Sequence, residues 1–363
     1  MKQTTFIVNK QDLQEYQFVE TPVATSDLAD GQLLLKIDSF SFTSNNITYA
    51  MIGEQMRYWN FFPTKEGWGI IPVWGFAEVR ISKHEKIKEG ARFYGYFPTA
   101  THLVVDASKV QSFRFVDAST HRKELPPVYN YYTNTQKDAL YTQESEHIQS
   151  LLRPLFVTSF LIDDFLVENN CFGATQLILT SASSKTALAL AFLLHQRNQH
   201  HSADVQVIGL TSSGNVDFVN QSGFYDQVIA YDQLSNIQND RPSLIVDFAG
   251  NHALQYNIQT HLKDQLTYNC TVGMVHWDQR AGDKPLPMRG SLFFAPTYAQ
   301  KRQKDWGPVG FNQRLGSVWK DLLAGVAGWL SVHQQSGKEA MAEVYLNILN
   351  GKIDPKQGQI LSL

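Results

Sequence analysis

The sequence predicts an α/β fold of two domains: an antiparallel barrel-like lobe, followed by a doubly wound parallel sheet. Three observations support this. The 363 residues exceed the usual size of one compact domain, and 43% of them are hydrophobic, which is enough to fill two cores. The first hundred residues read as short strands separated by turns. Beyond Ala174, strand-like and helix-like patterns alternate.

The N-terminal hundred residues contain short strand-like runs bounded by turn residues. The pairs Asp30-Gly31 and Glu89-Gly90 are turn signals that each precede such a run. Short strands joined in this way pack most naturally as a half-buried antiparallel barrel. The predicted strands cover residues 33–37, 39–42, 71–73, 76–81, 92–97 and 102–105.

Residues 112–150 have a different character. They contain the pair Pro126-Pro127 and three tyrosines, Tyr129, Tyr131 and Tyr132. We expect a long surface connection between two domains, since long connections are often functional. Its tyrosines either line a pocket or anchor the loop to the surface.

The alternation of strands and helices in the second half predicts a parallel sheet. A helical stripe runs from Ala187 to Leu194, and a second helix ends at the glycine stop Gly223. Such a sheet opens its ligand crevice at the carboxyl ends of its strands. The predicted strands cover residues 176–180, 205–210, 227–231, 244–248 and 266–272.

Charge and cysteine content exclude several classes of protein. With 31 Lys and Arg against 34 Asp and Glu, the net charge is -3, which is too little positive charge to hold a nucleic acid. The two cysteines, Cys171 and Cys270, supply neither a disulfide framework nor a multi-thiolate zinc site. No apolar stretch is long enough to suggest a membrane partner, and no secretion signal follows Met1. We therefore expect a cytoplasmic protein that acts on a small molecule.

The segment Thr180-Ser181-Ala182-Ser183-Ser184-Lys185-Thr186-Ala187 follows the first strand of the predicted sheet and opens a helix. Amides at a helix start carry partial positive charge, so a diphosphate fits there. Glycines normally fill this turn, but here Ser183, Ser184 and Thr186 stand in their places.

Two other interpretations of this turn stay open. Serines are ordinary helix caps and need no ligand. Ser184, Lys185 and Thr186 also resemble the end of a phosphate-binding loop for nucleoside triphosphates. That loop needs glycines where this chain has Leu179 and Ser184, so kinase or ATPase chemistry is the weaker interpretation.

The end of the second strand of the sheet favours NADPH over NADH. A carboxylate at this position binds the ribose hydroxyls of NAD, but the chain has Thr211, Ser212 and Ser213 followed by Gly214 and Asn215. Nothing there repels an additional phosphate, and Thr211 and Ser213 offer hydroxyl donors. The alternative is a polar loop without a ligand.

The order of these parts resembles the zinc-free quinone and enoyl reductases of the medium-chain dehydrogenase/reductase superfamily, over almost the whole chain. More closely, the sequence is similar to an uncharacterised bacterial branch of that superfamily, a domain of unknown function. The strings that carry this closer resemblance are NNITY at 45–49, PVWGF at 72–76, YGYFP at 94–98, SASSKT at 181–186 and FAP at 294–296.

The resemblance implies a GroES-like barrel lobe and a Rossmann domain. It places the catalytic lobe with its tyrosine-rich connection at 1–150, the nucleotide-binding domain at 151–300 and a segment returning to the catalytic lobe at 301–363. It also implies that relatives of this kind often pair through the cofactor sheet, so a homodimer is possible.

The resemblance further implies roles for single residues. Tyr231 matches a position that touches the adenosine phosphate, Gly250 and Gly273 match loops along the nicotinamide, and Phe294 matches a segment that closes over it. The zinc-dependent relatives carry a cysteine and a histidine-glutamate pair in the barrel lobe. The matching stretches here, 41–46 and 74–76, offer no such ligands, so we expect no metal.

Hydride transfer from NADPH to a quinone or an α,β-unsaturated carbonyl needs alignment and a donor for the developing oxygen charge. The resemblance makes Tyr49 the first candidate donor, and Asn46 is a second. The candidate substrate pocket comprises Trp59, Trp74, Tyr94, Tyr96 and His276. The alternative for these aromatic residues is core packing, and His276 either shuttles a proton or lies in a surface loop. The alternative function is a non-catalytic, dehydrogenase-like nucleotide sensor.

Overall fold

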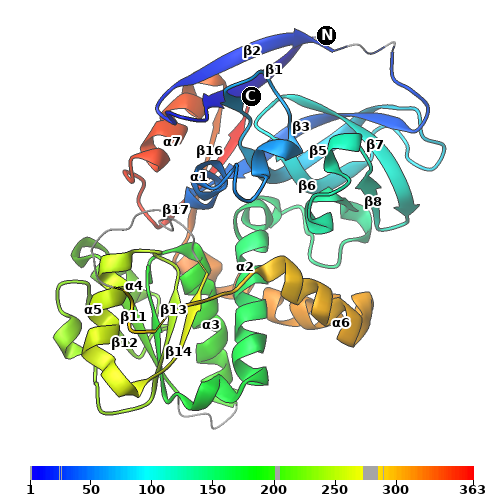
Figure 1. The fold of residues 1–363 in the computed structure, drawn as a ribbon. Helices are drawn as coiled ribbons and strands as arrows, with labels where there is room; N and C mark the ends of the chain where they lie inside the picture. Colours follow the sequence, from blue (N-terminus) through cyan, green and yellow to red (C-terminus); the bar gives the residue numbers. More distant parts are fainter. Residues whose placement is uncertain (1, 24, 26, 201–204, 273–284, 289) are drawn as a thin grey trace. The chain divides into compact units, whose positions relative to one another are not determined.

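The computed structural model describes residues 2–23, 25, 27–200, 205–272, 285–288 and 290–363 (Figure 1). The chain divides into two compact units. Residues 1–151 and 331–363 form the first unit, and residues 152–330 form the second.

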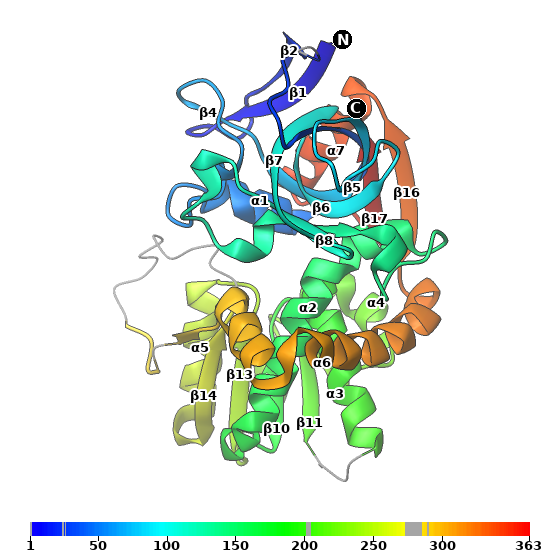
Figure 2. The same ribbon diagram turned by 90° about the vertical axis from the view of Figure 1, so that its right-hand side faces the viewer.

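Six antiparallel strands of the first unit close into a barrel. β3 pairs with both β5 and β7, and this second pairing closes the ring in the order β3-β5-β6-β9-β8-β7. Figure 2 shows β5, β6 and β7 curving around a common centre. The predicted antiparallel barrel lobe is therefore confirmed. The strands are β3 (Gln32–Phe42), β5 (Pro72–Ser82), β6 (Arg92–Pro98), β7 (His102–Gln111), β8 (Arg114–Asp117) and β9 (Tyr131–Asn134).

The β3–β5 pairing of the barrel contains register shifts, and a glycine lies opposite one of them. The β3–β5 pairing shifts between Ile37 and Ser39. At Gly75, opposite this shift, an added Cβ would lie 2.2 Å from the Ser39 carbonyl oxygen. Only a glycine allows the two backbones to approach so closely.

Further elements of the first unit complete it around the barrel. The C-terminal segment adds two strands beside β3. β17 (Gln357–Ser362) pairs with β3, and β16 (Ser331–Ser336) pairs with β17. The helix α7 (Lys338–Leu349) connects β16 to β17 along the chain. A separate three-stranded sheet and one helix come from the N-terminal part. They are β1 (Lys2–Asn9), β2 (Tyr16–Pro22), β4 (Trp68–Gly69) and α1 (Ser44–Met51).

The prediction of a surface connection over 112–150 is wrong for its central part. β8 and β9 lie in this region and are two of the six barrel strands. Phe115 of β8 and Tyr132 of β9 are fully buried, and their rings stack with centroids 4.9 Å apart. Tyr132 therefore belongs to the barrel core, and burying these rings stabilises strands of only four residues.

The second unit contains a six-stranded, fully parallel sheet in the order β12-β11-β10-β13-β14-β15. Numbered from its first strand, this is the order 3-2-1-4-5-6 of a doubly wound dinucleotide-binding fold. The predicted sheet is confirmed. Its strands are β10 (Gln176–Leu179), β11 (Gln206–Thr211), β12 (Gln227–Ala230), β13 (Ser243–Asp247), β14 (Leu266–Thr271) and β15 (Ser291–Leu292).

Helices cover both faces of the parallel sheet. In Figure 1, α3 lies on one side of the strands and α5 on the other, as right-handed crossovers running in opposite directions require. Every residue of β10 and β13 is buried, which is typical of central strands covered on both faces. The helices of this part are α2 (Glu146–Glu168), α3 (Lys185–His200), α4 (Val216–Gln221), α5 (His252–Leu262) and α6 (Ala295–Gly325).

The second unit extends to residue 330, whereas the resemblance placed this boundary at 300. The long helix α6 accounts for the difference, because it packs within the second unit. Its Trp319 is almost fully buried and contacts the ring of Phe156 in α2 at a centroid distance of 5.3 Å. The return to the first unit begins at Ser331.

In the described part of the chain, none of the helices has the length and apolar character needed to cross a membrane.

Candidate functional site

The turn between β10 and α3 has an unusual backbone for its sequence. Ser181 has a φ of +49°, in the left-handed region that side chains other than glycine rarely adopt. The turn closes through a hydrogen bond from the Ser184 amide to the Ser181 carbonyl oxygen at 2.8 Å. Ala182 is buried, and its amide donates to Leu210 of β11 at 2.9 Å. The tight turn thus forms without glycine.

The serine hydroxyls of this turn bond to the protein itself. Ser184 Oγ accepts from the Ala187 amide at 3.3 Å, so Ser184 caps α3. Ser183 Oγ lies 3.3 Å from Thr211 Oγ1 and 3.1 Å from Asn215 Nδ2, both of which donate to it. A side-chain cap satisfies only one of the leading amides of a helix, and the helix dipole stays in place. Capping by Ser184 is therefore compatible with an anion at the same helix end.

Two tyrosines hold the turn from the side of β12. Tyr231 Oη accepts a hydrogen bond from the Ser181 amide at 3.0 Å, and Tyr225 Oη donates to the Ala182 carbonyl oxygen at 3.0 Å. Gly209 of β11 makes room for this packing, because a Cβ there would lie 2.9 Å from the Tyr225 ring. Tyr231 thus lies at the turn between β10 and α3, and its hydroxyl contacts the backbone there. The sequence pattern gave no signal for Tyr225 or Gly209.

A buried hydrogen-bond network joins β10 to β13, where the order of the sheet reverses. Thr180 Oγ1 donates to Asp247 Oδ1 at 2.6 Å and accepts from the amides of Phe248 and Ala249 at 2.9 and 3.0 Å. Asp247 Oδ1 also accepts from the Ala249 and Gly250 amides, at 3.0 and 3.2 Å. This network fixes the two loops that border the crevice of such a sheet.

Asp247 is only 2% exposed, and burial raises the pKa of its carboxyl group against the opposing effect of these hydrogen bonds. Sequence reasoning assigned no role to Thr180 or Asp247. The sequence did contain a signal for this pair: Asp247 ends one apolar run, and Thr180 ends another.

The other predicted cofactor residues follow the carboxyl ends of the strands. Thr211 is buried at the end of β11, and Ser212 and Ser213 are exposed directly after it. Gly250, with φ +62°, follows β13, and Phe294 precedes α6 just after β15. Because all these strands are parallel, the residues line one edge of the sheet.

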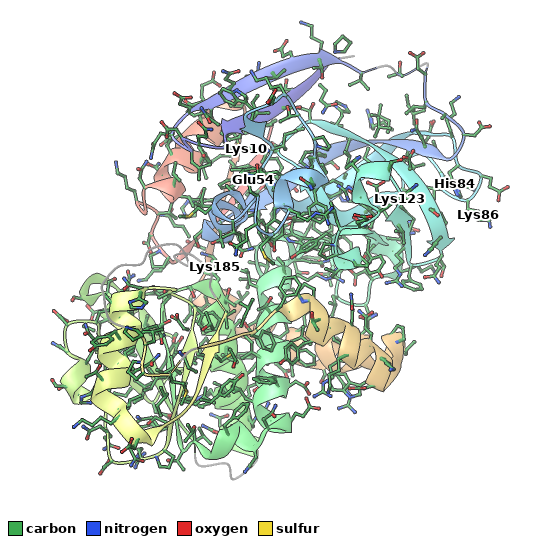
Figure 3. The ribbon with its side chains drawn as sticks, viewed as in Figure 1. Lys10, Glu54, His84, Lys86, Lys123 and Lys185 are labelled. Carbon is green, nitrogen blue, oxygen red and sulfur yellow. The ribbon has the colours of Figure 1, made fainter. Side chains whose placement is uncertain are left out.

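Lys185 begins α3, and Figure 3 shows it at the same end of the second unit. Thr186 follows it in the first turn, where its carbonyl oxygen accepts from Ser159 Oγ at 2.8 Å. The predicted residues Gly273 and His276 lie outside the described residues.

In the first unit, four tyrosines from separate segments form one buried cluster, called here the tyrosine cluster: Tyr49, Tyr58, Tyr96 and Tyr129. The ring of Tyr49 lies 4.5 Å from that of Tyr58 and 5.8 Å from that of Tyr96, and the Tyr96 and Tyr129 rings are 4.7 Å apart. The hydroxyls of Tyr58 and Tyr129 are 3.1 Å apart. Trp74 packs against this cluster, 5.0 Å from Tyr96.

The phenols of the tyrosine cluster are neutral at physiological pH. Burial raises the pKa of each, and neighbouring phenols raise the pKa of Tyr58, Tyr96 and Tyr129 further. For Tyr49, the side chains of Trp74 and Asn45 oppose this effect. Tyr96 Oη is buried and has no hydrogen-bond partner among the described residues. The cluster therefore carries no charge at neutral pH and can donate hydrogen bonds.

The structure does not bring every predicted residue to this cluster. Trp59 packs in the neighbouring core, where a Cβ on Gly53 or Gly69 would lie only 2.2 or 2.4 Å from its ring. The ring of Tyr94 contacts those of Phe76 and Trp74, and it stacks on Trp74 with ring centroids 5.5 Å apart. The Trp59 contacts are those of a packing residue.

Asn46 has a structural task at the start of α1. Its Oδ1 accepts from the Thr43 amide at 2.8 Å, and its Nδ2 donates to the Pro72 carbonyl oxygen at 2.9 Å. Asn46 is 3% exposed, so these bonds use its amide to join α1 to β5. This geometry supports a positioning role rather than contact with a substrate.

The sequence pattern did not indicate a role for Tyr58 or Arg122. For Tyr129 it left two roles open, lining a pocket or anchoring a loop. Arg122 is 1% exposed, forms an ion pair with Asp117 at 3.2 Å and lies over the ring of Phe62 at 4.6 Å. These residues come from 3-10 turns, Tyr58–Phe61, Thr120–Arg122 and Pro127–Asn130, which show no hydrophobic period.

Within the described ranges, no three His, Cys, Asp or Glu side chains gather closely enough to hold a metal ion.

A closed antiparallel barrel joined in one chain to a parallel sheet of order 3-2-1-4-5-6 defines the fold of the medium-chain dehydrogenase/reductase superfamily. The chain belongs to the family described as "Protein of unknown function (DUF2855)", whose model matches residues 40–354. No curated protein matches the chain.

Several solved structures share this fold. CurA from Vibrio vulnificus, in complex with NADPH, is 11% identical with a TM-score of 0.63, and the match covers 99% of this chain and 98% of that one. A mutant enoyl thioester reductase from Candida tropicalis is 11% identical with a TM-score of 0.55, and the yhdH oxidoreductase from Salmonella enterica, in complex with NADP, is 12% identical with a TM-score of 0.53. Both matches cover 100% of each chain.

Proposed function

We propose that the protein is an NADPH-dependent oxidoreductase that transfers hydride, without zinc, to a quinone or to the activated double bond of an α,β-unsaturated carbonyl. One observation carries the proposal. A tight phosphate turn leads from β10 into α3 at the carboxyl edge of a doubly wound sheet, and hydroxyl groups rather than a carboxylate follow β11. The NADPH- and NADP-bound structures of the same fold support it.

The residues present fit a dinucleotide phosphate. The first turn of α3, opened by Ser183 and Ser184, would hold the diphosphate. The exposed hydroxyls of Ser212 and Ser213 would bind the additional phosphate of NADPH. Gly250, which has a left-handed backbone in the loop after β13, would lie along the nicotinamide. When bound, the cofactor supplies the hydride.

The tyrosine cluster supplies the proton in this proposal. Tyr49 is the proposed donor, because the family resemblance places it in the donor segment and its neutral phenol can donate a hydrogen bond. Its ring lies in contact with the rings of Tyr58 and Tyr96. A neutral donor suits a substrate whose carbonyl oxygen gains negative charge during reduction. Trp74 offers a flat, half-buried surface beside it for a planar substrate.

Thermal shift followed by a turnover assay tests this function. Because a ligand that binds the native state raises its stability by mass action, NADPH should raise the melting temperature more than NADH or ATP. NADPH oxidation is then followed with a panel of quinones and enones. A shift with ATP alone would contradict the cofactor assignment.

A second function, nucleotide binding without turnover, is favoured by one observation. The hydroxyls of Ser183 and Ser184 are held in the turn by bonds of their own, as expected for a structural scaffold. In that case NADPH would raise the melting temperature, but no quinone or enone in the panel would oxidise it.

A further inference from the structure

The phosphate turn places a serine where the backbone favours glycine. Ser181 has a φ of +49°, and its Cβ makes this left-handed conformation unfavourable for an isolated serine. Such a residue persists only where its surroundings hold it in place. The contacts around Ser181 therefore show how this chain maintains a turn that relies on glycine elsewhere.

Two phenol groups form hydrogen bonds with the backbone of the turn, one at Ser181 and one at the next residue, Ala182. Tyr231 Oη accepts from the Ser181 amide, and Tyr225 Oη donates to the carbonyl oxygen of Ala182, each at 3.0 Å. Tyr225 lies just before β12 and Tyr231 just after it, so the segments that flank one strand supply both groups. Burial raises the pKa of the Tyr225 phenol, so its hydroxyl keeps the proton that it donates.

The packing around this arrangement is specific. Gly209 lies opposite the Tyr225 ring, and an added Cβ would lie 2.9 Å from that ring and 3.0 Å from Ala182 Cβ. The Ala182 amide is meanwhile bonded to Leu210 at 2.9 Å. The turn is thus fixed by the backbone of β11 and by the two phenols.

We propose that Tyr225 and Tyr231 are positioning residues for the cofactor: together they form a clamp that holds the Ser181 turn in its phosphate-binding conformation, which glycine would adopt without support. The inference rests on the proposed NADPH site. It also gives Tyr231 a different task from direct contact with the adenosine phosphate.

A double-mutant cycle between Tyr231→Phe and Ser181→Gly tests the clamp. Loss of one buried hydrogen bond that maintains the turn should weaken NADPH binding about tenfold in Tyr231→Phe, measured by calorimetry. Glycine adopts a positive φ without support, so Tyr231→Phe in the Ser181→Gly background should weaken binding by about twofold or less. Tyr345→Phe is the matched control: it removes a phenol bonded to the Leu13 carbonyl oxygen in the first unit and should leave the affinity unchanged.

Equal losses of affinity in the two backgrounds would overturn the clamp and show direct ligand contact by Tyr231 instead. Unchanged affinity in Tyr231→Phe would overturn it as well. Tyr225→Phe, measured with and without Ser181→Gly, gives the same test for the second phenol.

Urea unfolding of the cofactor-free variants separates this inference from the proposed function. The clamp predicts that Ser181→Gly also reduces the effect of Tyr231→Phe on the unfolding midpoint, with no nucleotide present. If the wild-type protein does not bind NADPH, the proposed function is wrong. The coupling between the two substitutions in urea unfolding would still support the clamp. Strict additivity of the two midpoint shifts rejects the clamp whether or not NADPH binds.

Discussion

Replacing Thr180 by valine removes the hydroxyl that joins β10 to β13 while keeping the shape of the side chain. The hydroxyl donates to Asp247 Oδ1 at 2.6 Å, and a hydrogen bond to a charged group contributes about 2 kcal/mol. The Phe248 amide donates to the same hydroxyl at 2.9 Å, and the loss of this hydrogen bond costs about 1 kcal/mol of stability. The Ala249 amide keeps a bond to Asp247 at 3.0 Å. Thr180→Val should therefore lower the free energy of unfolding by about 3 kcal/mol.

Urea unfolding followed by circular dichroism measures this change, with Thr180→Ser as the control. Serine keeps the hydroxyl and loses one methyl group, so the control should cost about 1 kcal/mol. The loops after β10 and β13 border the proposed cofactor site, so Thr180→Val should also weaken NADPH binding. A Thr180→Val variant as stable as Thr180→Ser would refute the assigned role of this network.

Three further predictions concern the site and the second unit. Ser184→Glu places a carboxylate at the diphosphate position and should weaken NADPH binding at least about 100-fold by calorimetry, whereas Ser184→Ala loses only the cap and should keep most of the affinity; equal affinities would place the phosphates elsewhere. Tyr49→Phe should lower kcat and leave the Kd for NADPH unchanged, and an unchanged kcat would reduce Tyr49 to a packing residue. Burial raises the pKa of Asp163 from 3.8 to about 6, so its contribution favours the folded state at low pH and is lost as the pH rises through 6. Between pH 4 and 7, wild-type protein should lose about 2 kcal/mol more unfolding free energy than Asp163→Asn, and parallel pH profiles would contradict the shift.

Much of the fold could be predicted because it depends on local patterns. The buried run at 176–180 and the helix after it show the strand and helix periods of a parallel sheet, and the structure has β10 and α3 there. β8 and β9 were missed because each has only four residues and lies among polar residues, without the continuous apolar run that marks β10. Their pairing joins Phe115 to Tyr132, a contact between residues far apart in the sequence that no local pattern shows.

The candidate site was predicted to the extent that it follows the strand ends. Serine-rich segments after β10 and β11 lie at one edge because parallel strands end there. The network of Thr180 and Asp247 and the bond from the Ser181 amide to Tyr231 depend on side chains 50 or more residues apart, so spacing in the sequence gave no indication of them. The tyrosine cluster likewise combines segments whose proximity follows only from closure of the barrel.

The end of α6 illustrates the same limit for domain boundaries. The resemblance placed the return to the first unit at residue 301, but helical packing of Trp319 keeps the chain in the second unit until residue 330. Burial of that ring against Phe156 of α2 is a tertiary interaction, which no local sequence pattern shows.

Hydrogen exchange of the whole protein, with and without saturating NADPH, tests the central claim most directly, since it locates where the nucleotide binds. The amides of residues 181–188 and 211–215 should become protected, because they lie at the carboxyl edge of the parallel sheet. Protection confined to other segments, or no change at saturating NADPH, would contradict the assignment of this edge as a dinucleotide site.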